Sequence, residues 1–312
     1  MYSWKAEMPP KGTPRTSTVR RVVNSSSPLP NFLAALQNPG IDSALSTLAS
    51  LGYFSYNRYE SDSRQEGEKR MEQWEQLAPG GLRFLKGGFP AGTDTFLLSS
   101  FPRLKPGLRV CDLGCGGGLL SLLLLQRQRE LTVTGLELLP EAAAVARRAA
   151  AENRLEGRFS IRQGDLRDCR GLFPSGSFDL VVCNPPYYPP ETGRMAEDAR
   201  RRAARAEVNC TLEEVCTAAA WLLRWGGAFC LVHKPERLAE LCCFLREHGL
   251  EPKRLRLVEP TAGRRPSLLL LEGRRGGKPG LDIEPPLVMQ SEDGSPTAEL
   301  DAIYFRTEEA AP

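Results

Sequence analysis

From about residue 108 onward, short apolar segments alternate with longer segments of helical periodicity, and this alternation constrains the fold more than any other feature. Seven apolar segments have the length and composition of strands, at residues 109–113, 131–137, 159–163, 178–183, 228–233, 254–259 and 267–272. Helical segments lie between most of them, at 118–129, 140–153, 211–225 and 235–248. This order predicts a Rossmann-like α/β fold, a seven-stranded and mostly parallel sheet with helices on both faces. A turn at 261–266 joins the last two strands, so one strand should be antiparallel.

The first 70 residues differ from the rest of the chain. Breaker-rich segments interrupt them, among them Pro9-Pro10-Lys11-Gly12, and a regular period persists only briefly at 31–51. Such a segment buries too little apolar surface to offset its ordering entropy. We therefore predict a poorly ordered extension over 1–70 and one folded domain over 71–312. Met71 opens the regular part, and a natural translation start there is a hypothesis that the mass of the native protein tests.

Composition argues against a membrane protein and against a metal centre. The longest apolar run, 119–125, is about a third of the ~20 residues that a membrane helix needs. The N-terminus has no apolar region typical of a secretory signal, so we expect a cytoplasmic protein. The nine cysteines are scattered, and no second Cys pair or His pair completes a zinc set. We expect neither a metal nor disulfides.

A glycine-rich segment follows the first predicted strand. Gly114, Gly116 and Gly118 let the backbone turn sharply and approach a ligand without side-chain obstruction. Dinucleotide sites and adenosylmethionine sites both use such a loop. Here the GxGxxG spacing is missing, and Asp112 precedes the first glycine. A carboxylate repels a pyrophosphate but attracts a cationic ligand with an amino group, which favours S-adenosyl-L-methionine as the cofactor.

Acidic residues also end the next two predicted strands. Glu137 ends the second strand, and Asp165 follows the third. Parallel strands end at one edge of a sheet, and ligands bind at that edge, so Asp112, Glu137 and Asp165 should lie near one ligand. We predict that Glu137 accepts hydrogen bonds from the ribose hydroxyls and that Asp165 accepts one from the adenine amino group.

The fourth predicted strand runs directly into Asn184-Pro185-Pro186-Tyr187. Two prolines fix the backbone and remove two N–H donors, which leaves a rigid loop with free carbonyls. If the Asn184 side-chain oxygen and the Pro185 carbonyl accept both hydrogens of a conjugated amine, its lone pair can attack a sulfonium methyl in line. Tyr187 can stack on the planar target group. Asn184, Pro185 and Tyr187 are therefore the predicted catalytic residues.

These motifs, from Asp112 through Gly118, Glu137, Gly164-Asp165 and Asn184 through Tyr187, resemble those of class I amino-group methyltransferases. Within that class the chain is similar to the bacterial tRNA(Val) adenine-N6 methyltransferases, over about residues 71–305. The segment 92–98 resembles the part of that family that closes over the methionine end of the cofactor. The resemblance implies that Thr93 and Asp94 lie near S-adenosyl-L-methionine and that the substrate is an adenine N6 amine in tRNA.

Basic residues support an RNA substrate. A run of five arginines stands against two acids directly after the catalytic loop, at Arg194, Arg200, Arg201, Arg202 and Arg205. It could bind phosphates near a flipped base. Further cations follow and could extend an RNA track, at Lys253, Arg254, Arg256, Arg264, Arg265, Arg274, Arg275 and Lys278. Each run taken alone is also typical of a solvated face.

Two other functions fit the same motifs. A side-chain amide also suits the Asn184 loop, so a glutamine N5-methyltransferase acting on release factors is an alternative. That family carries a helical domain before its catalytic domain, whereas residues 1–70 are rich in breakers. A binding module that keeps the cofactor pocket without catalysis is the other alternative, and the intact Asp112, Glu137, Asp165 and Asn184 argue against it. The sequence leaves the RNA species, the modified position and the oligomeric state open.

Overall fold

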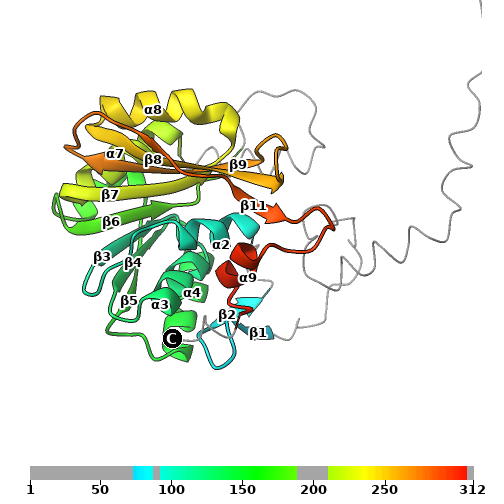
Figure 1. Ribbon diagram of the computed structural model, residues 1–312. Helices are drawn as coiled ribbons and strands as arrows, with labels where there is room; N and C mark the ends of the chain where they lie inside the picture. The colour runs from blue at the N-terminus through cyan, green and yellow to red at the C-terminus, as the bar shows by residue number, and fades with distance from the viewer. Residues whose placement is uncertain (1–72, 87–91, 188–209, 308–312) are drawn as a thin grey trace, which may run out of the picture. The chain divides into compact units, whose positions relative to one another are not determined.

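One large sheet organises the protein in the computed structural model, which describes residues 73–86, 92–187 and 210–307 (Figure 1). The predicted extension over 1–70 lies outside these residues. The order of strands across the sheet is β10-β8-β9-β7-β6-β3-β4-β5, and β11 also pairs with β8. The strands span Arg109–Leu113 (β3), Thr132–Glu137 (β4), Phe159–Gln163 (β5), Phe178–Cys183 (β6), Leu223–His233 (β7), Leu250–Thr261 (β8), Leu268–Arg275 (β9), Asp282–Ile283 (β10) and Leu287–Gln290 (β11).

The pairing of these strands confirms the predicted sheet. β5, β4, β3, β6 and β7 run parallel to one another, and β9 is antiparallel to both β7 and β8. The sheet adds two short strands to the seven predicted ones, because β10 and β11 both pair with β8 in parallel. Pro285 and Pro286 separate these two strands. Because proline interrupts the alternating pattern of a strand, the sequence does not predict either of them.

Helices cover both faces of the sheet, as predicted (Figure 1). One face carries α2 (Thr93–Ser100), α3 (Leu119–Arg127) and α4 (Pro140–Glu152), and the other carries α5 (Cys169–Leu172), α7 (Leu212–Leu222) and α8 (Leu238–Glu247). Two 3₁₀ turns, η1 (Leu166–Asp168) and η2 (Pro235–Arg237), precede α5 and α8. α7 begins with a capping box, in which the Thr211 hydroxyl accepts from the Glu214 N–H and the Glu214 carboxylate accepts from the Thr211 N–H. Burial of the apolar faces of these helices against the strands forms the core.

The boundary between α7 and β7 differs from the prediction. The sequence places helix as far as Trp225, whereas α7 ends at Leu222 and β7 starts at Leu223. Gly226 has a φ of 76°, and the register between β6 and β7 shifts beside it. Gly226 and Gly227 therefore form an irregularity within a strand rather than the end of a helix. Trp225 consequently lies on a strand, where it is 75% exposed.

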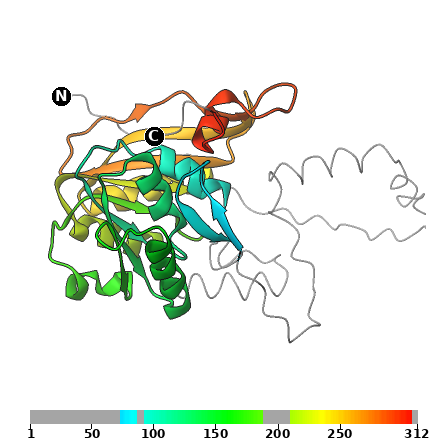
Figure 2. The same cartoon turned by 90° about the horizontal axis from the view of Figure 1, so that it is seen from below.

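Two smaller elements close the carboxyl side of the sheet. The hairpin of β1 (Gln73–Gln76) and β2 (Arg83–Lys86) packs against α3 and α4 (Figure 2). The Asn153 side chain anchors it, because its Oδ1 accepts from the Arg83 N–H and its Nδ2 donates to the Arg83 carbonyl, both at 2.7 Å. α9 (Ala298–Ile303) packs on α2, and the ring of Tyr304 stacks on Phe96 at 4.4 Å. The hairpin brings Phe84 and Leu85 to the site described next.

Candidate active site

The glycine loop leaves β3 at the carboxyl edge of the sheet, as predicted. Gly114 and Gly116 have φ of 69° and 54°, a left-handed conformation that favours glycine. A Cβ added at either position would meet no atom within 4 Å, so the loop faces open space. That space is a pocket of about 140 Å³, and it is lined by Phe84, Leu85, Thr95, Asp112, Gly114, Cys115, Gly116, Gly117, Leu119, Leu120, Val145 and Asn184.

Asp112 lies at this pocket and is only 1% exposed. Its Oδ2 accepts a hydrogen bond from the Ser121 hydroxyl at 2.7 Å. Burial raises the pKa of the Asp112 carboxyl to about 7, the Ser121 hydrogen bond opposes that rise, and the charge of Glu137 adds to it. The pocket thus holds a strongly desolvated acid that a cationic group would stabilise in its charged form.

Glu137 fixes the shape of the glycine loop. It ends β4 and is 7% exposed. Its Oε2 accepts from the Gly116 N–H and its Oε1 from the Leu139 N–H, both at 2.8 Å. In the described part of the chain neither Asp112 nor Glu137 forms an ion pair. Two buried carboxylates without a cation therefore fit a ligand that carries an amino group and hydroxyl donors, as S-adenosyl-L-methionine does.

Asp165 follows β5 at the same edge, but it has a protein partner. The Asp165 carboxylate caps η1 by accepting from the Arg167 N–H at 2.9 Å, and the Arg167 guanidinium pairs with it. Hydrogen bonding to Arg167 lowers the pKa of Asp165, and partial burial opposes that change. Asp165 does not line the pocket of the glycine loop. Its predicted contact with the adenine of the cofactor would need an exchange of this partner.

The segment 92–98 contributes a different residue from those predicted. Thr93 is exposed and Asp94 half-buried in the first turn of α2, and neither lines the pocket. Thr95, which the sequence did not single out, is 8% exposed and lines it. The Thr95 hydroxyl accepts a hydrogen bond from Nδ2 of Asn184 at 3.0 Å. This pairing joins residues 89 positions apart, so no local pattern could reveal it.

Asn184 stands where β6 ends, next to the glycine loop in the sheet. Its Nδ2 is engaged by Thr95, and its Oδ1 accepts from the Tyr187 hydroxyl at 3.0 Å. Pro185 and Pro186 line a second cavity of about 300 Å³, together with residues of α7 and α8. The amide of Asn184 is thus held in one orientation, with its oxygen facing a hydrogen-bond donor.

Two residues at the end of β7 support Tyr187. The rings of Tyr187 and His233 meet edge to face at 5.1 Å, and Nζ of Lys234 lies 5.3 Å from the Tyr187 ring centre. His233 is fully buried, and its Nδ1 accepts from the Lys234 N–H at 2.8 Å. Burial lowers the pKa of His233 to about 4, so the ring is neutral at pH 7. His233 has no role in the sequence prediction, because nothing in the chain marks it as a neighbour of Tyr187.

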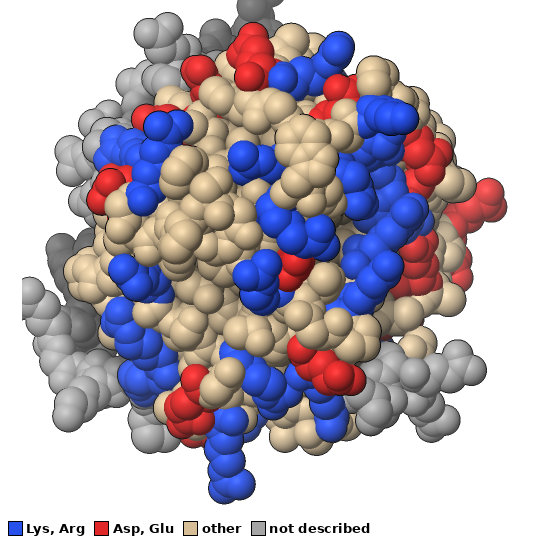
Figure 3. Space-filling view, turned by 90° about the vertical axis from the view of Figure 1, so that its left-hand side faces the viewer, with Lys and Arg blue, Asp and Glu red and all other residues tan. Residues whose placement is uncertain are grey.

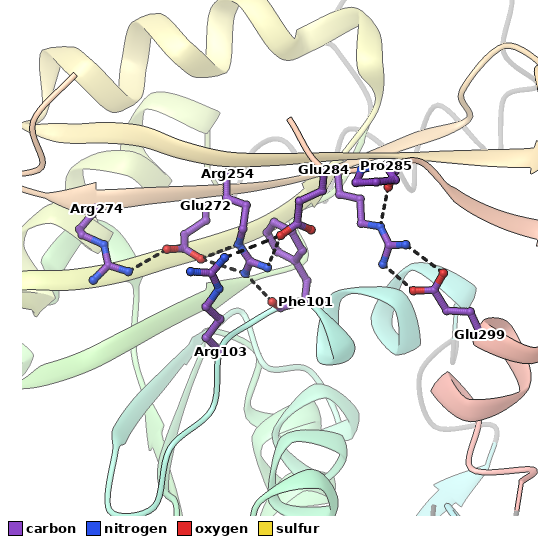
Figure 4. Close-up of polar contacts among 9 residues, drawn as sticks. Phe101, Arg103, Arg254, Glu272, Arg274, Glu284, Pro285 and Glu299 are labelled. Atoms are coloured by element: carbon purple, nitrogen blue, oxygen red, sulfur yellow. Dashed lines mark hydrogen bonds and ion pairs between the residues drawn. The ribbon is translucent and has the colours of Figure 1, made fainter. Parts of the chain in front are cut away.

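Some of the predicted RNA-binding cations lie outside the described residues, and others are buried or paired. Arg194, Arg200, Arg201, Arg202 and Arg205 lie outside the described residues. Arg254 is 7% exposed and points into the molecule, where it pairs with Glu272 at 2.9 Å and Glu284 at 3.0 Å (Figure 4). The expectation that Arg254 meets RNA is therefore wrong, because its charge is used to join β8, β9 and the chain after β10.

Arg256 and Arg274 also have acidic partners. Arg256 pairs with Glu299 of α9 at 2.6 Å, and Arg274 pairs with Glu272 at 3.0 Å (Figure 4). Unlike Arg254, the Arg274 side chain remains 42% exposed, so it can still meet solvent or a ligand.

Within 73–86, 92–187 and 210–307, no group of three His, Cys, Asp or Glu side chains could hold a metal ion. No helix in those ranges is long and apolar enough to cross a membrane.

The chain is similar to known methyltransferases in sequence. Residues 83–242 match the family model of the methyltransferase small domain. The chain is 33% identical over 189 residues to a tRNA1(Val) (adenine(37)-N6)-methyltransferase of Porphyromonas gingivalis, which covers 59% of this chain and 73% of that protein. A protein of the same name from a Shewanella species is 29% identical over 221 residues, 68% of this chain and 89% of that one.

Among solved structures, the chain is similar to a predicted O-methyltransferase of Agrobacterium tumefaciens. The TM-score is 0.57 at 21% identity, over 69% of this chain and 97% of that chain. At this identity the likeness concerns the fold, and it agrees with the sheet and helix layers described above.

Proposed function

The chain belongs to the methyltransferase small-domain family, and on that basis we propose a substrate. We propose that the protein methylates the N6 amine of an adenine in tRNA. The protein is an S-adenosyl-L-methionine-dependent N-methyltransferase. The finer substrate assignment rests on the names of its relatives and on one observation in the site. That observation is the fixed amide of Asn184, whose oxygen accepts from a phenol hydroxyl beside the glycine-loop pocket.

The pocket residues bind the cofactor in this proposal, together with Glu137, which accepts from the Gly116 N–H beside the pocket. Asp112 receives its ammonium group, Glu137 its ribose hydroxyls, and the backbone of Gly114 and Gly116 lies against it. Bound S-adenosyl-L-methionine supplies an activated methyl group on a sulfonium. We also keep Asp165, Thr93 and Asp94 as proposed cofactor contacts, although Asp165 must then leave Arg167 and Thr95 lies nearer to the pocket.

Asn184 and Pro185 hold the target amine. The conjugated lone pair of an exocyclic amine is a poor nucleophile, and two acceptors placed on its two hydrogens make the nitrogen more tetrahedral. Asn184 offers Oδ1 for this purpose, because Thr95 engages the opposite end of the amide and prevents a flip. The backbone carbonyl of Pro185 is the second acceptor. The amine proton leaves after transfer, and no covalent intermediate with the protein is required.

Tyr187 occupies the acceptor before a substrate arrives. Its hydroxyl donates to Oδ1 of Asn184, the position that the amine hydrogen takes in the proposed complex. The phenol must therefore exchange that partner when the target base enters, and its ring can then stack on the base. His233 and Lys234 border the ring on the side of β7 and limit where it can go.

The RNA assignment includes features outside the described residues. Arg200, Arg201, Arg202 and Arg205 follow the catalytic loop and are proposed to contact phosphates near the target base. The proposal also takes 71–312 as the catalytic domain, 1–70 as an N-terminal extension, and the cytoplasm as the location, where tRNA is the available substrate.

One experiment tests the substrate. The full chain is incubated with labelled S-adenosyl-L-methionine and either total RNA or total protein, and the products are digested to nucleosides or amino acids. Label in N6-methyladenosine is the expected result. Label in glutamine would instead assign the enzyme to release-factor modification and overturn the RNA proposal.

A variant separates catalysis from cofactor binding. Asn184→Ala removes the acceptor, and turnover should fall by roughly 10²- to 10³-fold while cofactor affinity measured by calorimetry stays close to wild type. Equal turnover in wild type and variant would remove Asn184 from the catalytic assignment.

A further inference from the structure

The amino edge of the sheet, opposite the glycine loop, carries an exposed aromatic ring among cations. Trp225 is 75% exposed, the highest value among the exposed large hydrophobic residues of the described chain. A Cβ at Gly276 would lie 2.2 Å from its indole ring, so the ring rests on a position that only glycine can supply. One side of the indole is thus supported by backbone, and most of the residue faces solvent.

Three arginines donate to backbone carbonyls of the short segment that carries Trp225. Arg224 donates to the Trp225 carbonyl at 3.1 Å, Arg274 to the Gly226 carbonyl at 3.1 Å, and Arg275 to the Leu223 carbonyl at 2.8 Å. A guanidinium has five N–H donors, which is more than these contacts use. The arginines are therefore held in place and can still bind an anion at little further entropic cost.

Some of the cations on this face share their acidic partners. Arg109 and Arg224 share one carboxylate, Asp179, and Arg274 shares Glu272 with the buried Arg254. Lys278 is exposed on the turn that follows Gly276, and Lys253 fastens that turn through the Lys278 and Gly280 carbonyls. Figure 3 shows this edge of the molecule, where Lys and Arg side chains gather around uncharged surface.

We propose that this surface, defined as Trp225 with Arg224, Arg274, Arg275 and Lys278, binds the RNA substrate at nucleotides remote from the methylated base. An indole with one open face stacks on an unpaired base of any identity, and fixed guanidinium groups bind the flanking phosphates. A protein partner would need a contiguous apolar patch, whereas the side chains that donate to the Leu223–Gly226 carbonyls are the arginines at 224, 274 and 275. This inference rests on the proposed RNA substrate and adds a second contact to it.

The two sites are far apart. β7 runs from Leu223 at the amino edge to His233 beside Tyr187, which at 3.3 Å per residue is on the order of 30 Å. An RNA that reaches both must extend well beyond a short stem-loop around the target. Full-length tRNA and a short stem-loop should therefore respond differently to changes at Trp225.

The test compares RNA affinity and methylation for two RNAs. Trp225→Ala in the full chain should weaken binding of full-length tRNA by about tenfold, the loss of one stacked base. Methylation of the short stem-loop should keep its wild-type kcat/KM, which also shows that the variant folds. Ile283→Ala is the matched control, because Ile283 is likewise exposed, at 64%, but lies on β10, three strands from β7 in the sheet.

Charge is tested separately. Lys278→Ala should reduce the slope of log affinity against log salt concentration by roughly one for full-length tRNA, as expected for one lost phosphate contact. Wild-type affinity and an unchanged salt slope in both variants would overturn the inference. So would a change in oligomeric state of Trp225→Ala without a change in RNA affinity, since it would assign the ring to a protein contact.

The results that would contradict this second contact differ from those that would contradict the proposed function. If wild type forms N6-methyladenosine and both variants bind tRNA normally, only the second contact is wrong. If wild type methylates glutamine and binds no RNA, both assignments fail together.

Discussion

At the scale of single residues, the pKa of the Asp112 carboxyl determines how stability and cofactor affinity depend on pH. Its pKa is raised to about 7 by burial, far above the unfolded value near 3.8. A carboxyl with a raised folded pKa stabilises the fold at low pH, and this contribution is lost as pH rises through about 7. A cationic ligand reverses the effect, because it favours the charged carboxylate. Cofactor affinity should therefore decrease as pH falls below about 7.

Asp112→Asn should separate these two effects. Without cofactor the variant should unfold at a higher temperature than wild type at pH 8, and the difference should narrow as pH falls toward 4. Cofactor affinity at pH 8 should fall strongly, since the neutral amide cannot pair with an ammonium. Thermal scans and calorimetry measure the two quantities, and a variant that is less stable than wild type at pH 8 would contradict the pKa argument.

Thr95 should matter for turnover more than for cofactor binding. Thr95→Val removes the hydroxyl that engages Nδ2 of Asn184 and frees the amide to rotate. We expect kcat to fall about 10- to 100-fold, the effect of a misplaced reactant. Thr95→Ser keeps the acceptor and should retain most of the activity. Equal activity of the Val and Ser variants would show that Asn184 is oriented by other contacts.

At the scale of elements, the glycine loop combines two different requirements. Gly114 and Gly118 both have left-handed backbone, with φ of 69° and 88°. Only at Gly118 would a Cβ meet the sheet, since it would lie 3.0 Å from the Phe159 ring. Gly114→Ala should therefore cost about 1–2 kcal/mol of unfolding free energy from backbone strain. Gly118→Ala should lose about 1–3 kcal/mol more from overpacking, and denaturant unfolding without cofactor measures both.

The β8–β9 hairpin is held by an internal charge cluster (Figure 4). Arg254→Met leaves Glu272 buried without its main cation, which should cost about 3–5 kcal/mol of unfolding free energy. Arg256→Ala breaks the more exposed pair with Glu299 and should cost less than about 1 kcal/mol. Similar losses in the two variants, measured by denaturant unfolding, would show that burial of the Arg254 pair has no special importance.

At the scale of the whole molecule, the sequence alone predicts the elements that have a regular apolar pattern and the residues that directly follow them. The apolar runs of β3 and β6 predict both strands, and Asn184 follows one directly, so the position of the catalytic loop is predictable. The start of β7 was not predictable, because Gly226 and Gly227 resemble the end of a helix. Thr95 and His233 were missed because their partners are distant in the chain, and Arg254 was misassigned because its burial depends on Glu272 and Glu284.

The hydrogen bond from Tyr187 to Asn184 has a consequence for the end of the reaction cycle. An unmodified amine brings two hydrogens to two acceptors, but a methylated amine keeps only one after it loses a proton. In the proposed complex one acceptor then lacks a donor, and a buried acceptor without a partner is unfavourable. The Tyr187 hydroxyl can return to Asn184 and restore the balance. The same phenol that donates to Asn184 before the substrate enters would then displace the product and disfavour a second methylation of the same nitrogen.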